Sequence, residues 1–248
     1  MTRTAKMLSI FTAIATLTST ILGSSQVGAQ APPAKAPGAV TAIDILLEPD
    51  AVMIRHAQAA NAHLRKNFPE GYALDATHQP HISCLQRYVR TADLDKVYKA
   101  VADVLSTEKP ATWKLKAYKY YYIPWKEAGL AGIVIEPTAD LIRYQRKLID
   151  AVAPFTVQTG SAAAFVTTKE APDINQPTID YVEKFVPDET GEKFSPHVTI
   201  GLAKQEYLKQ MLAEKFEPFT FSPVGASVYK LGDFGTARTK LKSIQFKP

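Results

Sequence analysis

The sequence predicts an α+β protein of two similar lobes. Segments with the alternation of strands and segments with helical spacing follow one another along 42–248, and each half of this range contains one copy of a short motif. The motif is Pro-His, an aliphatic residue, a hydroxyl residue and an apolar residue. It is PHISC at 80–84 and PHVTI at 196–200.

The first 29 residues have the layout of a secretory signal peptide. Arg3 and Lys6 precede an apolar run that contains Thr and Ser, and Val27-Gly28-Ala29 supplies small residues for cleavage after Ala29. A membrane anchor is the alternative, but the run is short for one. We expect export to the periplasm or the medium, a flexible Pro/Ala-rich leader over 30–41, and a folded domain over 42–248.

Charge and cysteine content limit the function classes. Without Arg3 and Lys6 the formal charge of +5 becomes +3, which suits an anionic ligand but not a protein that coats nucleic acid. Because Cys84 is the only cysteine, no internal disulfide can form, and we expect Cys84 to be a small buried side chain.

Periodicity and capping residues predict the elements in order. The predicted strands are 42–47, 79–89, 113–123, 131–136, 194–203 and two or three within 219–246. The predicted helices are 51–68, one that begins at Thr91 and carries apolar residues on one face as far as Leu105, one capped by Thr138 and reaching Val152, 178–185, and 205–215. The polar segment 165–176 is predicted as a loop, and the glycines of GDFGTAR, 232–238, as turn formers.

The repeated motif indicates acid/base chemistry. Because side chains alternate on a strand, His81 and Ser83 share one face, as do His197 and Thr199. Two imidazoles that titrate near neutral pH can act together, one accepting a proton while the other donates one. Serine and threonine hydroxyls can donate hydrogen bonds to phosphate oxygens without adding charge. Such a site requires no metal and no other cofactor.

The two motifs resemble those of the 2H phosphoesterase superfamily, which includes 2′,3′-cyclic phosphodiesterases and 2′-5′ RNA ligases. The resemblance covers most of the chain after the signal peptide. It implies a bilobal, pseudo-twofold fold with two antiparallel sheets facing a central cleft and helices outside. It also implies metal-independent catalysis by His81 and His197 and phosphate binding by Ser83 and Thr199. Some members have an aromatic residue shortly after a motif, where this chain has Leu202.

The leading functional hypothesis is hydrolysis of 2′,3′-cyclic phosphates on small nucleotides or short RNA ends. Formation or reversal of 2′-5′ phosphodiesters is an alternative, because acid and base exchange roles in the reverse direction. A non-catalytic binder of phosphorylated ligands is a second alternative. We expect a monomer that binds neither double-stranded nucleic acid nor, once the signal peptide is removed, a membrane.

Further residues are weaker candidates for substrate binding. Arg87 shares strand parity with His81 and could meet a phosphate. In 113–123, alternation places Trp113, Leu115, Ala117, Tyr121 and Ile123 on a mostly apolar face, and the opposite face carries Lys116, Tyr118, Tyr120 and Tyr122. That second face could stack on a base and contact phosphate, or it could be an ordinary exposed strand face.

The remaining histidines suggest no chemistry. His78 lies three residues before His81, a spacing that a metal site can use on a helix, but an extended segment would not bring the two rings together. His56 and His63 fall on the first predicted helix, where we expect them at the surface or flank.

Overall fold

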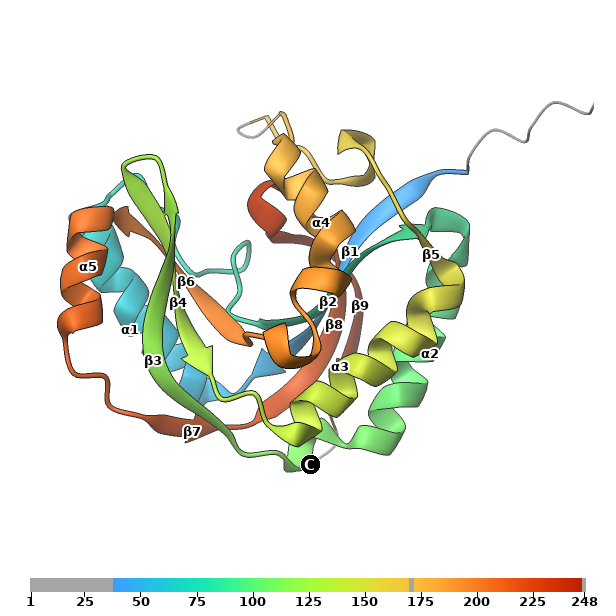
Figure 1. Cartoon of the computed structure of the whole chain (residues 1–248), viewed down its shortest axis with the longest axis horizontal. Coiled ribbons are helices and arrows are strands. Elements are labelled where there is room, and N and C mark those ends of the chain that lie inside the picture. Colours follow the sequence, from blue (N-terminus) through green and yellow to red (C-terminus); the bar gives the residue numbers. More distant parts are fainter. Residues whose placement is uncertain (1–37, 170–171, 247–248) are drawn as a thin grey trace, which may run out of the picture. The chain divides into compact units, whose positions relative to one another are not determined.

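Two antiparallel sheets with surrounding helices form the part of the chain that the computed structural model describes, residues 38–169 and 172–246 (Figure 1). The strands are β1 (Val40–Pro49), β2 (Ile82–Arg90), β3 (Leu115–Trp125), β4 (Ala128–Ile135), β5 (Thr156–Val157), β6 (His197–Lys204), β7 (Phe219–Phe221), β8 (Pro223–Leu231) and β9 (Ala237–Gln245). The α-helices are α1 (Ala51–Asn67), α2 (Leu94–Glu108), α3 (Ala139–Val152), α4 (Gln176–Asp188) and α5 (Gln205–Ala213).

Most element predictions are confirmed, with ends shifted by about three residues at most, and the α+β class is confirmed with them. The short strand β5 was not predicted. Thr91 does not cap α2: residues Thr91–Asp93 form a 3-10 turn, and the Thr91 hydroxyl instead bonds that of Thr41 at 2.8 Å. The predicted signal peptide and the leader up to residue 37 lie outside the described residues, while the end of the predicted leader, from Val40, is already part of β1.

The sheets do not correspond to the two halves of the sequence. Sheet A has the order β5-β2-β1-β8-β9, and sheet B has the order β6-β4-β3-β7. The late strands β8 and β9 therefore join sheet A beside β1, at the opposite end of the sequence. Each sheet nevertheless contains one motif strand, β2 in sheet A and β6 in sheet B.

Helices cover both sheets, and one apolar core joins them. In Figure 1, α2 and α3 lie next to sheet A, while α1 and α5 lie next to sheet B. The core includes Ile45 of β1, Leu85 of β2, Ile133 of β4 and Val198 of β6, each with at most 1% of its surface exposed. Burial of these side chains from both sheets holds the motif strands in one structural unit.

The helix α1 shows how the sequence fixes these contacts. Asp50 caps it by accepting a hydrogen bond from the main-chain nitrogen of Val52 at 2.9 Å. Met53, Ala57 and Leu64 then recur on one face with helical spacing and are fully buried. This face packs against β6, so α1 connects the first part of the chain to the second motif strand.

Three of the β-bulges lie in strands that carry predicted site residues, where they interrupt the regular alternation of side chains. The extra residue is Cys84 in β2, Ile200 in β6 and Tyr118 in β3. In both motif strands the bulge comes directly after the motif hydroxyl, Ser83 or Thr199. Each extra residue shifts the alternation by one, so residues that follow it point to the face opposite to the one expected from sequence parity.

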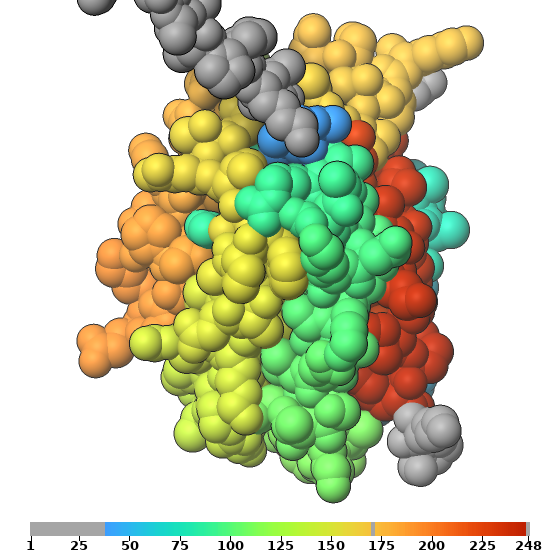
Figure 2. Space-filling model, turned by 90° about the vertical axis from the view of Figure 1, so that its right-hand side faces the viewer, coloured from blue at the N-terminus to red at the C-terminus, as the bar shows by residue number. Residues whose placement is uncertain are grey.

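Two surface hollows in the described part of the chain lie away from the motifs. Figure 2 shows the face formed by α2 and α3, where a hollow of about 560 Å³ is lined by residues that include Lys99, Val104 and Phe155. Another, of about 540 Å³, lies beside Trp113 and Arg143. Neither contains a predicted site residue. Within the described ranges, no helix has the length and apolar character needed to cross a bilayer.

Candidate active site

The two motif histidines are held in the same way. His81 directly precedes β2, and His197 is the first residue of β6. In each ring Nδ1 lies 2.8 Å from the main-chain carbonyl oxygen two residues earlier, that of Gln79 or Ser195. Because a carbonyl oxygen only accepts hydrogen bonds, Nδ1 carries a proton in both rings. Nε2 is therefore the nitrogen that each imidazole can use for proton exchange.

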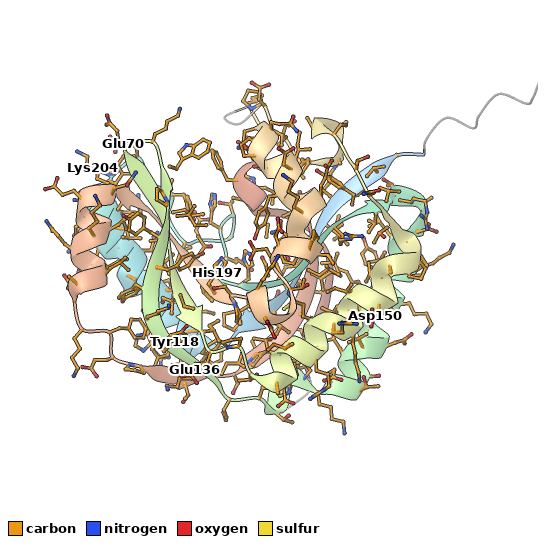
Figure 3. All side chains as sticks on the ribbon, in the orientation of Figure 1. Glu70, Tyr118, Glu136, Asp150, His197 and Lys204 are labelled. Carbon is orange, nitrogen blue, oxygen red and sulfur yellow. The ribbon has the colours of Figure 1, made fainter. Side chains whose placement is uncertain are left out.

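His197 is suited to accept a proton. Figure 3 shows it at the start of β6, where its half-buried ring lies edge to face with the Tyr121 ring, with 4.9 Å between centroids. Burial lowers the pKa of His197 below 6.5, the hydrogen bond to the Ser195 carbonyl opposes this, and the charge of His81 lowers the pKa further. The two motif strands, β2 and β6, contact each other. The lowered pKa keeps His197 neutral at pH 7.

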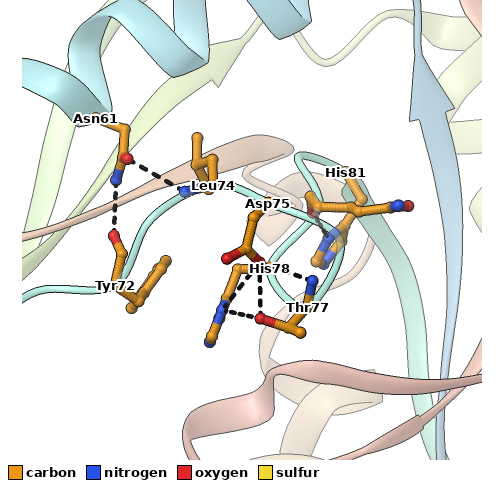
Figure 4. A network of polar contacts seen from close by, with 8 residues as sticks. Asn61, Tyr72, Leu74, Asp75, Thr77, His78 and His81 are labelled. Carbon is orange, nitrogen blue, oxygen red and sulfur yellow. Dashed lines mark hydrogen bonds and ion pairs between the residues drawn. The ribbon is translucent and has the colours of Figure 1, made fainter.

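The loop before His81 is an ordered polar network (Figure 4). The Asp75 carboxylate accepts hydrogen bonds from the main-chain nitrogen and the hydroxyl of Thr77, each at 2.7 Å. The Thr77 hydroxyl also lies 2.9 Å from Nδ1 of His78, and the His78 ring stacks on Tyr72 at 4.3 Å. His78 is thus engaged within the loop. Among the described residues, no three His, Cys, Asp or Glu side chains gather as a metal site would require.

A buried carboxylate that the sequence analysis missed lies beneath the first motif. Asp44 of β1 is completely buried, and its Oδ2 accepts a hydrogen bond from the Ser83 hydroxyl at 2.6 Å. The same oxygen lies 3.7 Å from Nε2 of His81, whose side chain is 20% exposed. The available signal was the segment AIDILL, in which one Asp interrupts an apolar strand, because aspartate is almost never fully buried without a partner.

The second motif has apolar neighbours in the equivalent places. Thr199 faces Gly132 across the β6–β4 pairing and has no side-chain hydrogen bond within the described part of the chain. Two rungs further along, where the first motif has the pair Asp44 and Gln86, the second has Leu130 and Leu202. The two halves of the site are therefore alike in their histidines and hydroxyls but differ in the residues behind the hydroxyls.

Arg87 does not share the face of His81. Because Cys84 is an extra residue in β2, the residue that follows on the motif face is Gln86, whose amide nitrogen lies 3.4 Å from Asp44 Oδ2. Arg87 instead lies 3.4 Å from the Thr156 hydroxyl, and burial lowers its pKa. The prediction that Arg87 shares a strand face with His81 was wrong because of the extra residue Cys84.

The extra residue Tyr118 likewise reverses the faces on which the later residues of β3 lie. Tyr120 packs edge to face on Phe216 at 4.8 Å, and Tyr122 packs against the apolar core. Tyr121, which the sequence analysis placed on the apolar face, instead contacts His197.

The other two candidates on this strand have neighbours of their own. Lys116 forms an ion pair of 2.6 Å with Glu136, and the ammonium group of Lys119 lies over the Tyr118 ring, 5.3 Å from its centroid. Figure 3 shows Tyr118 and Glu136 together toward the lower end of β3 and β4. None of these contacts joins Lys116, Tyr118, Tyr120 or Tyr122 to a motif residue.

Comparisons with known proteins bear on the fold. No model of a protein family matches the chain, and no curated protein matches it. Among solved structures it is similar to TT0787 of Thermus thermophilus, with a TM-score of 0.50 and 16% identity over 83% of this chain and 97% of that one. The chain has a 2H phosphoesterase-like fold. At this identity the likeness concerns the fold alone.

Proposed function

We propose that the chain is a metal-independent phosphodiesterase that opens 2′,3′-cyclic phosphates on nucleotides or short RNA ends. The observation that carries this proposal is the pair of histidines, each anchored through Nδ1 at 2.8 Å and each followed two residues later by a hydroxyl. A base and an acid that face the same substrate are what an in-line displacement at phosphorus requires. The 2H phosphoesterase-like fold supports this class of reaction.

The site suggests a division of roles. Neutral His197 accepts a proton at Nε2 from a water molecule, whose oxygen attacks phosphorus. The bond between phosphorus and one ribose oxygen breaks, and His81 donates its Nε2 proton to that oxygen. The step leaves His197 protonated and His81 neutral, and solvent restores both states. The lowered pKa of His197 is the reason to assign it the role of base.

The second motif also supplies a hydrogen-bond donor for the phosphate. The Thr199 hydroxyl has no partner among the described side chains, so its proton is available to a phosphate oxygen. The Tyr121 ring packs edge to face with the His197 ring. This contact helps to fix the orientation of the imidazole and of its Nε2 atom.

An assay of the purified chain with 2′,3′-cyclic and 3′,5′-cyclic nucleotides, in excess chelator and over about pH 5 to 8, tests the proposal. We expect hydrolysis of the 2′,3′-cyclic substrates. His81→Ala and His197→Ala should each lose about 10²- to 10⁴-fold in turnover, and the double variant far less than the product of the two. His63→Ala, which removes an exposed histidine of α1, is the matched control. Hydrolysis of neither substrate class, or a chelator-sensitive activity, would contradict the proposal.

We also propose that the protein is exported and that the exported chain begins at Gln30. The support is the Val27-Gly28-Ala29 segment after the apolar run. Intact-mass measurement of the protein recovered outside the cytoplasm tests this, and a mass that still includes residues 1–29 would contradict it.

A further inference from the structure

Asp44 is an unusual neighbour for a phosphate-binding hydroxyl. Its carboxyl group is completely buried, and its Oδ2 is 2.6 Å from Ser83 Oγ, 3.4 Å from Gln86 Nε2 and 3.7 Å from His81 Nε2. Within the described residues, Oδ1 has no hydrogen-bond partner. A buried carboxylate with one unpartnered oxygen is costly, so this group has reason to bind a proton.

The hydroxyl of Ser83 has only one proton to donate. While Asp44 is ionised, that proton lies in the 2.6 Å hydrogen bond to Oδ2, and Ser83 presents only lone pairs to a ligand. Phosphate oxygens are acceptors too, so the two would repel. When Asp44 is protonated, its carboxyl group can donate to Ser83 Oγ, and the Ser83 proton becomes available to a phosphate oxygen.

We propose that Asp44 takes up a proton from solvent when a phosphate ligand binds, and that this reverses the Ser83 hydroxyl from a donor to Asp44 into a donor to phosphate. Asp44 is then a positioning residue that makes phosphate binding proton-linked. The inference rests on the proposed function, because it requires a phosphate between the two motifs.

The surroundings of Asp44 support this linkage. Burial raises its pKa, while the positive charge of His81 and the hydrogen bonds from Ser83 and Gln86 oppose the rise. The other titratable groups near it are Cys84 on β2 and Tyr181 on α4, both of which interact with its charge. Tyr229 is its cross-strand neighbour on β8. An anionic ligand adds a like charge beside His81 and Ser83, which favours protonation of Asp44 further.

The second half of the site supplies the matched control. Thr199 is the equivalent hydroxyl, but Leu130 stands in the place of Asp44. The hydroxyl proton of Thr199 is therefore available to a phosphate at any pH. Only the Ser83 half of the site can couple phosphate binding to proton uptake. Asp44→Asn imitates the protonated form, because the asparagine amide can donate to Ser83 Oγ. Asp44→Leu copies the second half and removes that donor.

Isothermal titration calorimetry with inorganic phosphate and a nucleoside 2′-monophosphate tests the inference. Each titration is done in two buffers of different ionisation enthalpy, which yields the number of protons taken up on binding. We expect wild-type protein and Thr199→Ala to take up more protons, by as much as one per site, than Asp44→Asn or Ser83→Ala. As pH rises, wild-type affinity should fall more steeply than that of Asp44→Asn, by up to about tenfold per pH unit. Asp44→Leu should bind more weakly than Asp44→Asn.

The outcomes separate this inference from the proposed function. Equal proton uptake by wild type and Asp44→Asn, with cyclic nucleotides still hydrolysed, would overturn only the role of Asp44. Linked phosphate binding without hydrolysis would overturn only the proposed function. Failure of the wild type to bind either phosphate ligand would overturn the role of Asp44, while the hydrolysis assay would still decide the proposed function. If Asp44→Asn does not fold, infrared difference spectra of the wild type decide: added phosphate should convert a carboxylate band into a protonated-carboxyl band, and an unchanged carboxylate band would refute the inference.

Discussion

The side-chain amide of Asn61 on α1 donates a hydrogen bond of 2.8 Å to the main-chain carbonyl of Ile200, the extra residue in β6. The same nitrogen donates to the Tyr72 carbonyl at 3.0 Å, and Asn61 Oδ1 accepts from the Leu74 nitrogen at 3.2 Å. One buried side chain thus ties the bulge of the second motif strand to the loop that leads to His81 (Figure 4). This connection joins the segment that leads to His81 with the strand that begins at His197.

Replacing Asn61 with alanine should destabilise the protein strongly. The change leaves two carbonyl oxygens and one main-chain nitrogen in the interior without their partners, and we expect a loss of about 3 kcal/mol in the free energy of unfolding. Urea denaturation measures it. His63→Ala on the exposed side of the same helix is the control and should change stability by no more than about 0.5 kcal/mol. An unchanged midpoint for Asn61→Ala would show that the network does not hold the fold.

Gly132→Ala should impair turnover more than stability. A Cβ at Gly132 would overlap the ring of Tyr121, which would have to leave its present position beside His197. Because small displacements of a catalytic group are costly, we expect kcat to fall about tenfold or more. Gly38→Ala is the control, since no atom lies within 4 Å of the added Cβ. Steady-state kinetics on both variants decide the matter, and wild-type kcat in Gly132→Ala would show that the Tyr121 contact is not needed.

An activated leaving group should separate the roles of the two histidines. A phosphodiester with a good leaving group needs little protonation of the departing oxygen, so His81→Ala should regain most of its activity on such a substrate. His197→Ala should not, because water still needs a base. Rescue of His197→Ala instead of His81→Ala would reverse the assignment.

The lowered pKa of His197 fixes the sign of a pH effect on stability. Its pKa in the unfolded chain is about 6.5, so between the lower folded value and 6.5 the unfolded chain binds more protons. The stability that neutral His197 contributes is complete above pH 6.5 and is lost as pH falls through the folded pKa. Urea denaturation at several pH values should show a smaller acid loss for His197→Asn than for the wild type. In kinetics, the acid limb of kcat/KM should lie below pH 6.5.

Titration of Asp44 should change the stability of the fold with pH in the opposite direction. Burial raises its folded pKa, so the penalty for the buried charge is present at high pH and disappears as pH falls through that raised value. Asp44→Asn should therefore be more stable than the wild type at pH values above that raised pKa, with a gain that fades on acidification. The same denaturation series measures this. A constant difference at every pH would indicate a packing effect rather than a titrating carboxyl group.

Simple alternation along the sequence predicted the correct strand face for site residues before each bulge and the wrong face for those after it. His81 with Ser83, and His197 with Thr199, precede the extra residues Cys84 and Ile200, so simple alternation assigned their faces. Arg87 and Tyr120 follow an extra residue and were assigned to the wrong face.

The sequence offered little warning of these bulges. Cys84, Ile200 and Tyr118 are all residues that ordinary strands accept, so nothing in their chemistry marks an irregularity. The glycine at position 201 offered a hint, because glycine can adopt backbone conformations that other residues rarely adopt. The structure shows such a conformation there, with a φ of 132°. The buried role of Asp44 depends on tertiary contacts with His81 and with Ser83 and Gln86 of β2, which alternation along β1 does not describe.

The bulge at Cys84 decides which later side chains of β2 lie on the face of Ser83 and Asp44. Deleting Cys84 would leave Leu85 opposite Ile45 and Gln86 opposite Asp44, so the later residues of β2 would keep their places. If the intact strand paired regularly, with Cys84 opposite Ile45, then Leu85 would stand opposite Asp44 and the contact with the Gln86 amide would be lost. The bulge therefore gives the buried carboxyl group a polar cross-strand neighbour where regular pairing of the same sequence would place an apolar one.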